Sequence, residues 1–471
     1  MSRLSASSAL FARHALLPDG WRADVLIEWD AAGAITAVRA GEQAAALATA
    51  DGVETVAYAL PGMINLHSHS FQRALGGRTE RAGPDNAGGA SQDSFWTWRD
   101  LMYRFARNIT PDHIEAIAAQ LFSECLRHGY TSLCEFHYVQ RTPDGAMYPR
   151  PAETAERVVA AARLTGIGVT MLPVLYSYSG FGESLLKPEQ QRFRTDASDV
   201  LRVIEALEPL RDAQTEVGAA PHSLRAASVA QINTALASLP AGRPVHIHIA
   251  EQQPEVRQSL DWSGRRPVEW LYDHVDVDAR WCLVHATHLT RDEVDLIARS
   301  GAVAGLCPTT EANLGDGLFP LEQFLAAGGR FGIGSDSHIS QSPVEELRWL
   351  EYGQRLQHQR RNIAVSPQQR QVGDFLWQGA LRGGAQATGR PVGALTPGCR
   401  ADVIVLDADH PNLYGLALDE VLGSFVFSGN DNLVKDVMVG GQWVVRNQQH
   451  VAQQAIAARF KQTMAELRNF R

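Results

Sequence analysis

The hydrophobic pattern between residues 61 and 390 alternates between a helical period and short apolar runs. Residues 110–128 have apolar side chains at helical spacing, with Thr110 as a cap and Pro111 in the first turn, and the pattern stops at Gly129. A strand-like run follows, and residues 151–176 repeat this plan. Later helix-like segments each precede an apolar run, in RPVHIHIAE, RWCLVHATH, AVAGLCPTT and RFGIGSDSH. This alternation predicts an α/β fold, and its length favours a parallel (β/α)₈ barrel.

Both ends of the chain are β-rich instead. The segment ADVLIEWDAAGAITAV contains two strand-like runs joined by an Ala-Gly turn, and residues 396–446 have a similar pattern with a turn at Gly440-Gly441. We therefore expect residues 1–60 and 391–471 to form one small β-sandwich, with a terminal helix, beside a barrel of residues 61–390.

Composition narrows the class of protein. The chain has 471 residues, 45% hydrophobic and 20% charged, as in soluble globular proteins. It has no membrane-length apolar run and no signal-peptide core, so we expect a cytoplasmic protein that does not bind membranes. The 5 scattered cysteines argue against a disulfide framework or a Cys-rich zinc site. A net charge of -9 without a basic stretch argues against nucleic acid as a partner.

Candidate metal ligands begin with His67 and His69, which directly follow the apolar run of residues 60–66. In a strand, residues i and i+2 face the same way, so both imidazoles are expected to point into the mouth of the barrel. Two neutral imidazoles on one strand make half of a zinc or iron site. Alone, such a pair is also common as ordinary surface or core histidine.

Further candidates lie at later strand ends. His248 ends VHIHI with Glu251 three residues on, His285 ends WCLVH, and Asp336 ends FGIGSD. His246 lies on the same strand face as His248, so either of them could be the ligand, and nearness to the strand end favours His248. Each residue alone has an ordinary structural explanation, but polar residues in register at successive strand ends are hard to explain in that way. Together they predict one divalent ion, Zn²⁺ or Fe²⁺, with the ligands His67, His69, His248 and Asp336.

The order of PGMINLHSH, HIHIAE, LVHATH and GSDSH resembles the amidohydrolase superfamily over nearly the whole chain. Its members carry His-x-His after the first strand, histidines after the fifth and sixth, and an aspartate after the eighth. Members with two metal ions bridge them with a carboxylated lysine on the fourth strand. Here the lysines are Lys187, Lys435 and Lys461, and Lys187 lies in a polar segment. The resemblance therefore implies a site for one metal ion, as in the deaminases of the superfamily. The sequence leaves the oligomeric state open, and a homodimer is expected only at the level of the family.

Catalytic roles follow from this arrangement. Asp336 would also accept a proton from the attacking water, and His285 would hydrogen-bond that water. Glu251 would protonate the leaving nitrogen as a general acid whose pKa is raised in a closed site, although a carboxylate at a helix start is the ordinary alternative. We expect hydrolysis at a trigonal C=N carbon, with ammonia as the leaving group.

Longer stretches point to the substrate. NLHSHSFQRALGGRTE, SFWTWRDLMY, EFHYV, PHSLRA and CPTTEANLGDGLFP are similar to deiminases of the superfamily that hydrolyse N-formimidoyl-L-glutamate to N-formyl-L-glutamate and ammonia. A small dicarboxylate needs fixed donors, for which arginine is best suited. By this resemblance the substrate-binding residues are Gln72, Arg99, Tyr138, His222 and Arg225. Arg99 is expected in an aromatic loop of residues 95–99, and the Gly/Ala-rich residues 81–94 are expected to form a lid.

Three other functions compete with this interpretation. A deaminase of guanine or another aminated heterocycle would need an aromatic pocket with few arginines. A barrel that only binds or assembles would lack a metal ligand, and a two-metal hydrolase would need the bridging lysine. The paired arginines disfavour a heterocycle deaminase. The complete set of metal ligands disfavours a barrel that only binds, and the lysine positions disfavour a two-metal hydrolase.

Overall fold

The computed structural model describes residues 8–48, 53–80 and 95–469, so the predicted lid at 81–94 lies outside the described residues. Its centre is a ring of parallel strands, in two hydrogen-bonded sheets of order β5-β6-β7-β8 and β10-β11-β12-β13, with β9 paired to β7. Parallel bridges from Ser68 to Asp336 and from Ala219 to Val245 join the two sheets at both edges. The (β/α)₈ barrel is therefore confirmed. Its strands are β5 (Met63–Ser68), β6 (Tyr130–His137), β7 (Gly168–Leu175), β8 (Thr215–Val217), β9 (Ala220–Pro221), β10 (Val245–Ile249), β11 (Trp281–His285), β12 (Val303–Leu306) and β13 (Arg330–Ile333).

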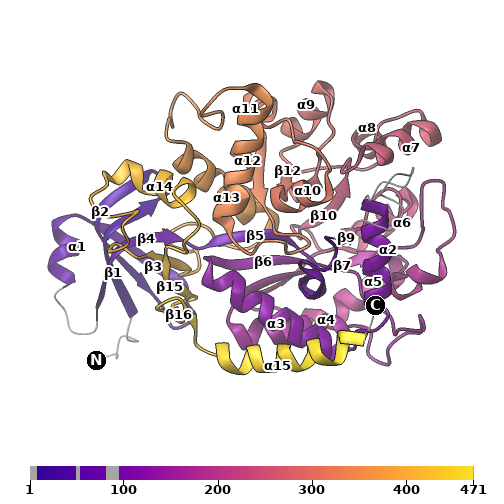
Figure 1. Cartoon of the computed structure of the whole chain (residues 1–471), viewed down its shortest axis with the longest axis horizontal. Coiled ribbons are helices and arrows are strands. Elements are labelled where there is room, and N and C mark those ends of the chain that lie inside the picture. The colour runs from indigo at the N-terminus through magenta and orange to yellow at the C-terminus, as the bar shows by residue number, and fades with distance from the viewer. Residues whose placement is uncertain (1–7, 49–52, 81–94, 470–471) are drawn as a thin grey trace.

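Helices cover the outside of the ring (Figure 1). The expected signals at their ends are present: the Thr110 side chain accepts from the backbone N–H of His113, and Gly166 ends the next helix with a φ of 82°. Among the described residues, no helix has the length and apolar character needed to cross a membrane. The helices of this region are α2 (Phe95–Ala106), α3 (Pro111–Arg127), α4 (Glu153–Thr165), α5 (Ala197–Leu207), α6 (Val229–Ser238), α7 (Gln253–Ser263), α8 (Pro267–His274), α9 (Arg291–Ser300), α10 (Pro308–Leu314), α11 (Leu321–Ala326), α12 (Pro343–His358) and α13 (Val372–Thr388), with the 3₁₀ helices η1 (Ser70–Leu75) and η3 (Pro188–Phe193).

The two ends of the chain pair in one separate sheet, of order β17-β16-β15-β14-β4-β1-β2-β3. Strand β4 joins the two ends, because it pairs with β1 on one side and with β14 on the other. The sheet folds over itself: a side chain at Gly33 would overlap the carbonyl oxygen of Gly440, although these residues lie near opposite edges. Its strands are β1 (Ser8–Leu17), β2 (Gly20–Trp29), β3 (Ile35–Ala40), β4 (Glu54–Pro61), β14 (Val403–Leu406), β15 (Val434–Val439), β16 (Gln442–Arg446) and β17 (Gln449–His450).

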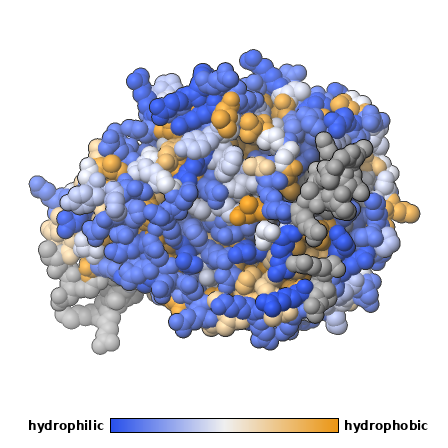
Figure 2. All heavy atoms as spheres, in the orientation of Figure 1, coloured by the Kyte–Doolittle hydropathy of each residue, from blue (hydrophilic) through white to orange (hydrophobic). Residues whose placement is uncertain are grey.

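Short helices interrupt the end segments where the pattern indicated only strands and turns. They are α1 (Glu42–Leu47), α14 (Val421–Phe427) and the 3₁₀ helices η5 (Leu418–Glu420) and η6 (Leu467–Asn469). The expected terminal helix is α15 (Gln453–Glu466). Helix α14 packs against α12 and α13 of the barrel, so its apolar residues cover barrel helices instead of extending the sheet. The face in Figure 2 is mainly hydrophilic, with hydrophobic residues in small groups.

Helix α13 packs so closely against β13 that an added side chain at Gly383 should destabilise the protein. A side chain at Gly383 of α13 would overlap the carbonyl oxygen of Phe331, so Gly383→Ala forces helix and strand apart. We expect it to lower the free energy of unfolding by about 1–3 kcal/mol, measured by chemical denaturation. Gly423→Ala in α14 is the matched control, because its side chain would meet nothing within 4 Å. Equal stability of the two variants would contradict this packing.

Candidate active site

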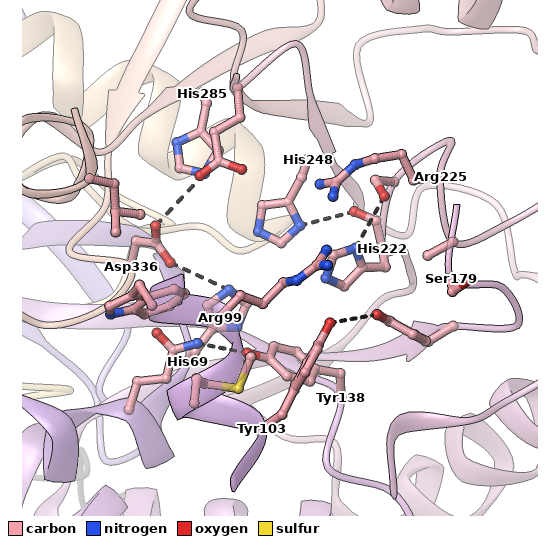
Figure 3. A pocket seen from close by; sticks show the side chains of 18 of the residues that line it. His69, Arg99, Tyr103, Tyr138, Ser179, His222, Arg225, His248, His285 and Asp336 are labelled. Atoms are coloured by element: carbon pink, nitrogen blue, oxygen red, sulfur yellow. Dashed lines mark hydrogen bonds and ion pairs between the residues drawn. The ribbon is translucent and has the colours of Figure 1, made fainter. Parts of the chain in front are cut away.

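The polar residues predicted at the strand ends meet at the mouth of the barrel. The Nε2 atoms of His67 and His248 lie 3.0 Å apart. Asp336 Oδ1 lies 3.5 Å from His67 Nε2 and 3.4 Å from His69 Nε2. All four side chains are buried. The donor atoms of β5, β10 and the end of β13 therefore surround one point, and Asp336 lies beside His69 in Figure 3.

An irregularity in β5 helps to aim these side chains. Between Asn65 and Ser68 the strand has one residue more than the matching stretch of β6, where Leu133 and Glu135 are the partners. Such a bulge bends a strand and redirects its side chains. Leu66 packs in the interior with residues of β11, and the next residue, His67, still reaches the site.

Hydrogen bonds fix the tautomers of two of the imidazoles. His69 Nδ1 lies 2.9 Å from the carbonyl oxygen of Phe136, and His248 Nδ1 lies 2.9 Å from that of His222. Because a carbonyl can only accept, each Nδ1 donates a proton and each Nε2 keeps its lone pair. Burial lowers the pKa of His69 and lowers the pKa of His248 well below its ordinary value, so both rings stay neutral. Lone pairs converging on a carboxylate are the donor set that a divalent cation needs.

His246, the alternative on the same strand, lies one layer deeper in the barrel. Its Nε2 is 2.8 Å from the carbonyl oxygen of Ala387 at the end of α13. His246 Nε2 therefore donates to this carbonyl and faces away from the mouth of the barrel. The geometry favours His248 as the metal ligand. His338, just beyond β13, instead lies within hydrogen-bond distance of the hydroxyls of Ser68 and Ser335.

A second layer of carboxylates surrounds His285 at the end of β11. Its Nε2 lies 3.6 Å from Glu251 and 3.7 Å from Asp336, and its Nδ1 lies 3.2 Å from Glu311. Burial alone would lower the pKa of His285, but these carboxylates outweigh it and raise the pKa to about 10. Burial raises the pKa of Glu251, so this carboxyl can hold a proton near neutral pH.

Backbone conformation at two of these residues is unusual. His285 has a φ of 68° and Asp336 a φ of 43°, a region that residues other than glycine rarely adopt. Strain of this kind is retained where the surroundings impose it, and it gathers at functional sites.

One pocket brings together the five predicted substrate-binding residues and the histidines and carboxylates. Gln72 donates to the Tyr138 hydroxyl over 2.6 Å, and the His222 ring lies 4.9 Å from that of His248. Arg99 and Arg225 enter from different elements and point into the pocket in Figure 3. The lining includes His69, Gln72, Arg99, Tyr138, His222, Arg225, His248, Glu251, His285 and Asp336.

The expectation of an aromatic loop around Arg99 is wrong. Residues 95–106 form helix α2, and Arg99 lies over the ring of Tyr103 one turn later, at 5.5 Å. Helical spacing brings residues i and i+4 to one face, so α2 presents both side chains to the pocket together.

Sequence reasoning missed several residues of this site. Glu311 follows β12 within CPTTE and obeys the same strand-end rule, which could have identified it. Tyr103 and Tyr176 line the pocket with their hydroxyl oxygens 3.0 Å apart, and no local motif marks them.

Comparisons with known proteins agree with this geometry. The model of the amidohydrolase family matches residues 58–444, and a model described as the N-terminal domain of formimidoylglutamate deiminase HutF matches residues 7–49. A formimidoylglutamate deiminase of Pseudomonas aeruginosa is 51% identical over 98% of this chain and 99% of that protein. An amidohydrolase structure from Brucella melitensis has a TM-score of 0.91 and 42% identity, over 98% of this chain and 99% of that one. A zinc-containing adenosine deaminase structure from Xanthomonas campestris, with a TM-score of 0.77 and 20% identity over 98% and 99% of the two chains, shares the fold.

The carboxylates around His285 predict a measurable change in its pKa. Glu311→Gln removes one negative charge beside Nδ1 while keeping the size of the side chain, so the pKa of His285 should fall from about 10 towards its ordinary value of 6.5. NMR titration of the metal-free protein with labelled histidine measures it, and the His285→Asn spectrum assigns the signal. An unchanged pKa would show that Glu311 does not act on this ring.

Proposed function

The chain belongs to the amidohydrolase family, and on that premise we propose that it hydrolyses N-formimidoyl-L-glutamate to N-formyl-L-glutamate and ammonia. The observation that carries this proposal is the pocket itself, in which Arg99 and Arg225 face the same space as the buried histidines and carboxylates. Two cationic forks suit a substrate with two carboxylates better than a neutral heterocycle. The Pseudomonas aeruginosa relative, 51% identical, is named for this activity.

We propose that one divalent ion, zinc or ferrous iron, is held by His67, His69, His248 and Asp336. The fixed tautomers support this assignment, because the lone pairs of His69 and His248 would otherwise be buried without a cation to meet them. A site for a single ion also agrees with the position of Lys187, which precedes η3 and does not line the pocket described here.

Each residue near the reacting carbon has a role that its position supports. A divalent ion, when bound, lowers the pKa of a water molecule and supplies a nucleophile at neutral pH. Asp336 would accept the proton that the attacking water loses as its oxygen bonds to the C=N carbon. His285, protonated and oriented by Glu311, donates from Nε2 to the oxygen and stabilises its charge. Glu251 would protonate the C=N nitrogen, and the proton held by Asp336 would then pass to the same nitrogen, which would depart as ammonia. The hydroxyl group on the tetrahedral carbon would return its proton to Glu251, so the formimidoyl group would become a formyl group.

The remaining pocket residues would hold the substrate. Arg99 and Arg225 form ion pairs with its carboxylates, and their planar groups fix its orientation. Gln72, Tyr138 and His222 line the same pocket as the arginines and the histidines, where they would meet the middle of the substrate. This arrangement would hold the C=N carbon at the end of a bound chain and convert a bimolecular reaction into an oriented one.

The depths of His246 and His248 predict different effects on metal binding. His248→Asn should release the ion during dialysis against a chelator that leaves the wild-type protein loaded, because the ligand set loses one imidazole. His246→Asn changes the same residue type two positions away and should keep the ion, since its Nε2 donates to Ala387. Elemental analysis of the dialysed proteins measures the retained metal, and the reverse order would contradict the assignment.

Ammonia release tests the proposed reaction. Zinc-loaded protein should turn over N-formimidoyl-L-glutamate quickly, N-formimidoyl-L-aspartate much more slowly and guanine not at all, and Asp336→Asn should abolish the activity. Turnover of guanine alone would replace the proposed substrate by a heterocycle. If metal-loaded protein turns over none of the three compounds, the proposed substrate is wrong, although the proposed metal site is not affected.

We also propose that the enzyme acts in the cytoplasm on this small dicarboxylate, binds no nucleic acid and forms a homodimer. The net charge of -9 supports the exclusion of nucleic acid. Light scattering of the purified protein measures the oligomeric state.

A further inference from the structure

The short helix η3 contacts the pocket only through other residues. It follows β7 in the chain and lies against α2, the helix that carries Arg99 and Tyr103. Three of its side chains, those of Gln190, Arg192 and Phe193, are almost completely buried. The described residues that line the pocket include none of the three. These three side chains therefore act on α2 and on the tyrosines, and they do not contact a ligand directly.

Arg192 caps the C-terminal end of α2. Its guanidinium donates to the carbonyl oxygen of Ala106, the last residue of the helix, and over 2.5 Å to that of Ile109. The last carbonyls of a helix lack partners within the helix and carry partial negative charge. Burial lowers the pKa of Arg192 to about 10, so the side chain stays charged at neutral pH. A buried cation is costly in isolation, and here main-chain carbonyls compensate it.

Gln190 supports a second point of the same helix, the Tyr103 side chain, through the Tyr176 hydroxyl. Its Nε2 donates to the Tyr176 hydroxyl over 2.8 Å, and that hydroxyl lies 3.0 Å from the Tyr103 hydroxyl (the dashed pair beside Tyr103 in Figure 3). Phe193 fills the space behind, with its ring 5.3 Å from that of Tyr103. Because Arg99 lies over the Tyr103 ring, a shift of Tyr103 moves the support of Arg99.

The barrel rim holds η3 itself in place. The backbone N–H of Arg141, just beyond β6, donates to the carbonyl oxygen of Arg192 over 3.1 Å. The Thr195 hydroxyl donates to the carbonyl oxygen of Val174 in β7 over 2.7 Å and accepts from the backbone N–H of Tyr176. The segment thus connects the ends of β6 and β7 to α2.

We propose that Gln190 and Arg192 are positioning residues that hold α2 where Arg99 meets a carboxylate of the substrate. This inference rests on the proposed function for the identity of the ligand, but the ordering of α2 by η3 is independent of it. The Arg192 cap and the hydrogen bonds from Gln190 through Tyr176 to Tyr103 fix two points of α2. Loss of either one should therefore let Arg99 move from its position.

Steady-state kinetics with Arg192→Met, Arg99→Met and the double variant tests the link. We expect each single variant to raise KM for N-formimidoyl-L-glutamate at least about tenfold with kcat changed far less, since Arg99 lies away from the reacting carbon. The double variant should be no worse than Arg99→Met alone, because both changes remove the same contact. Arg192→Lys, which reaches one carbonyl, should restore part of the loss. Independent, multiplying effects would overturn the proposal.

Hydrogen exchange of α2 separates this inference from the proposed function. Without any ligand, Arg192→Met should exchange faster over residues 98–106 than the wild type, and Gln190→Leu serves where Arg192→Met does not fold. Arg390→Met is the matched control: this arginine is also buried and donates to Ser132 and Ala213, but it lies at the other end of the barrel. It should lower thermal stability without changing KM or the exchange of α2. Unchanged exchange of α2 in the η3 variants would overturn the inference, whereas an unchanged KM in Arg99→Met would overturn only the substrate role.

Discussion

The mouth of this barrel concentrates buried imidazoles and carboxylates in a small space. His67, His69, His248 and Asp336 are each at most 5% exposed. The Nε2 atom of His67 lies 3.0 Å from that of His248, and Asp336 Oδ1 lies 3.5 Å from His67 Nε2 and 3.4 Å from His69 Nε2. Groups of this kind are costly to bury without partners, because each loses its hydration. A divalent cation meets the carboxylate and the lone pairs together. The rest of the structure depends on this constraint, since β5, β10 and β13 must end at the right depth for the four donors to converge.

Neighbouring elements maintain that convergence in different ways. A bulge in β5 aims His67, and carbonyl oxygens set the tautomers of His69 and His248. Positive φ values at His285 and Asp336 show that tertiary contacts override local backbone preference at two strand ends. At the rim, η3 holds α2 and its arginine from behind. The groups proposed to react therefore lie at or just beyond strand ends, and Arg99, proposed to bind the substrate, lies on helix α2.

The barrel and the shared terminal sheet could be predicted from sequence because both rest on periodicity, which a single chain displays directly. The strand-end rule likewise placed His285 and Asp336 in one site, since parallel strands bring their C-terminal ends together. It could not choose between His246 and His248 by position on a strand face, because the two share that face. Helix α2 was mistaken for a loop, since aromatic residues are weak helix formers and the contact of Tyr103 with Phe193 of η3 is not visible in the local pattern. The roles of Arg192 and Gln190 depend on contacts across 80 residues or more of chain, which no local pattern records.

Anomalous X-ray scattering at the zinc absorption edge, from crystals of the zinc-loaded protein, tests the central claim most directly. The account predicts one strong peak per chain, about 2.0–2.2 Å from the Nε2 atoms of His67, His69 and His248 and from an oxygen of Asp336. A second peak of equal height in the same pocket, or a peak held instead by the nearby group of His285, Cys307 and Glu311, would contradict it.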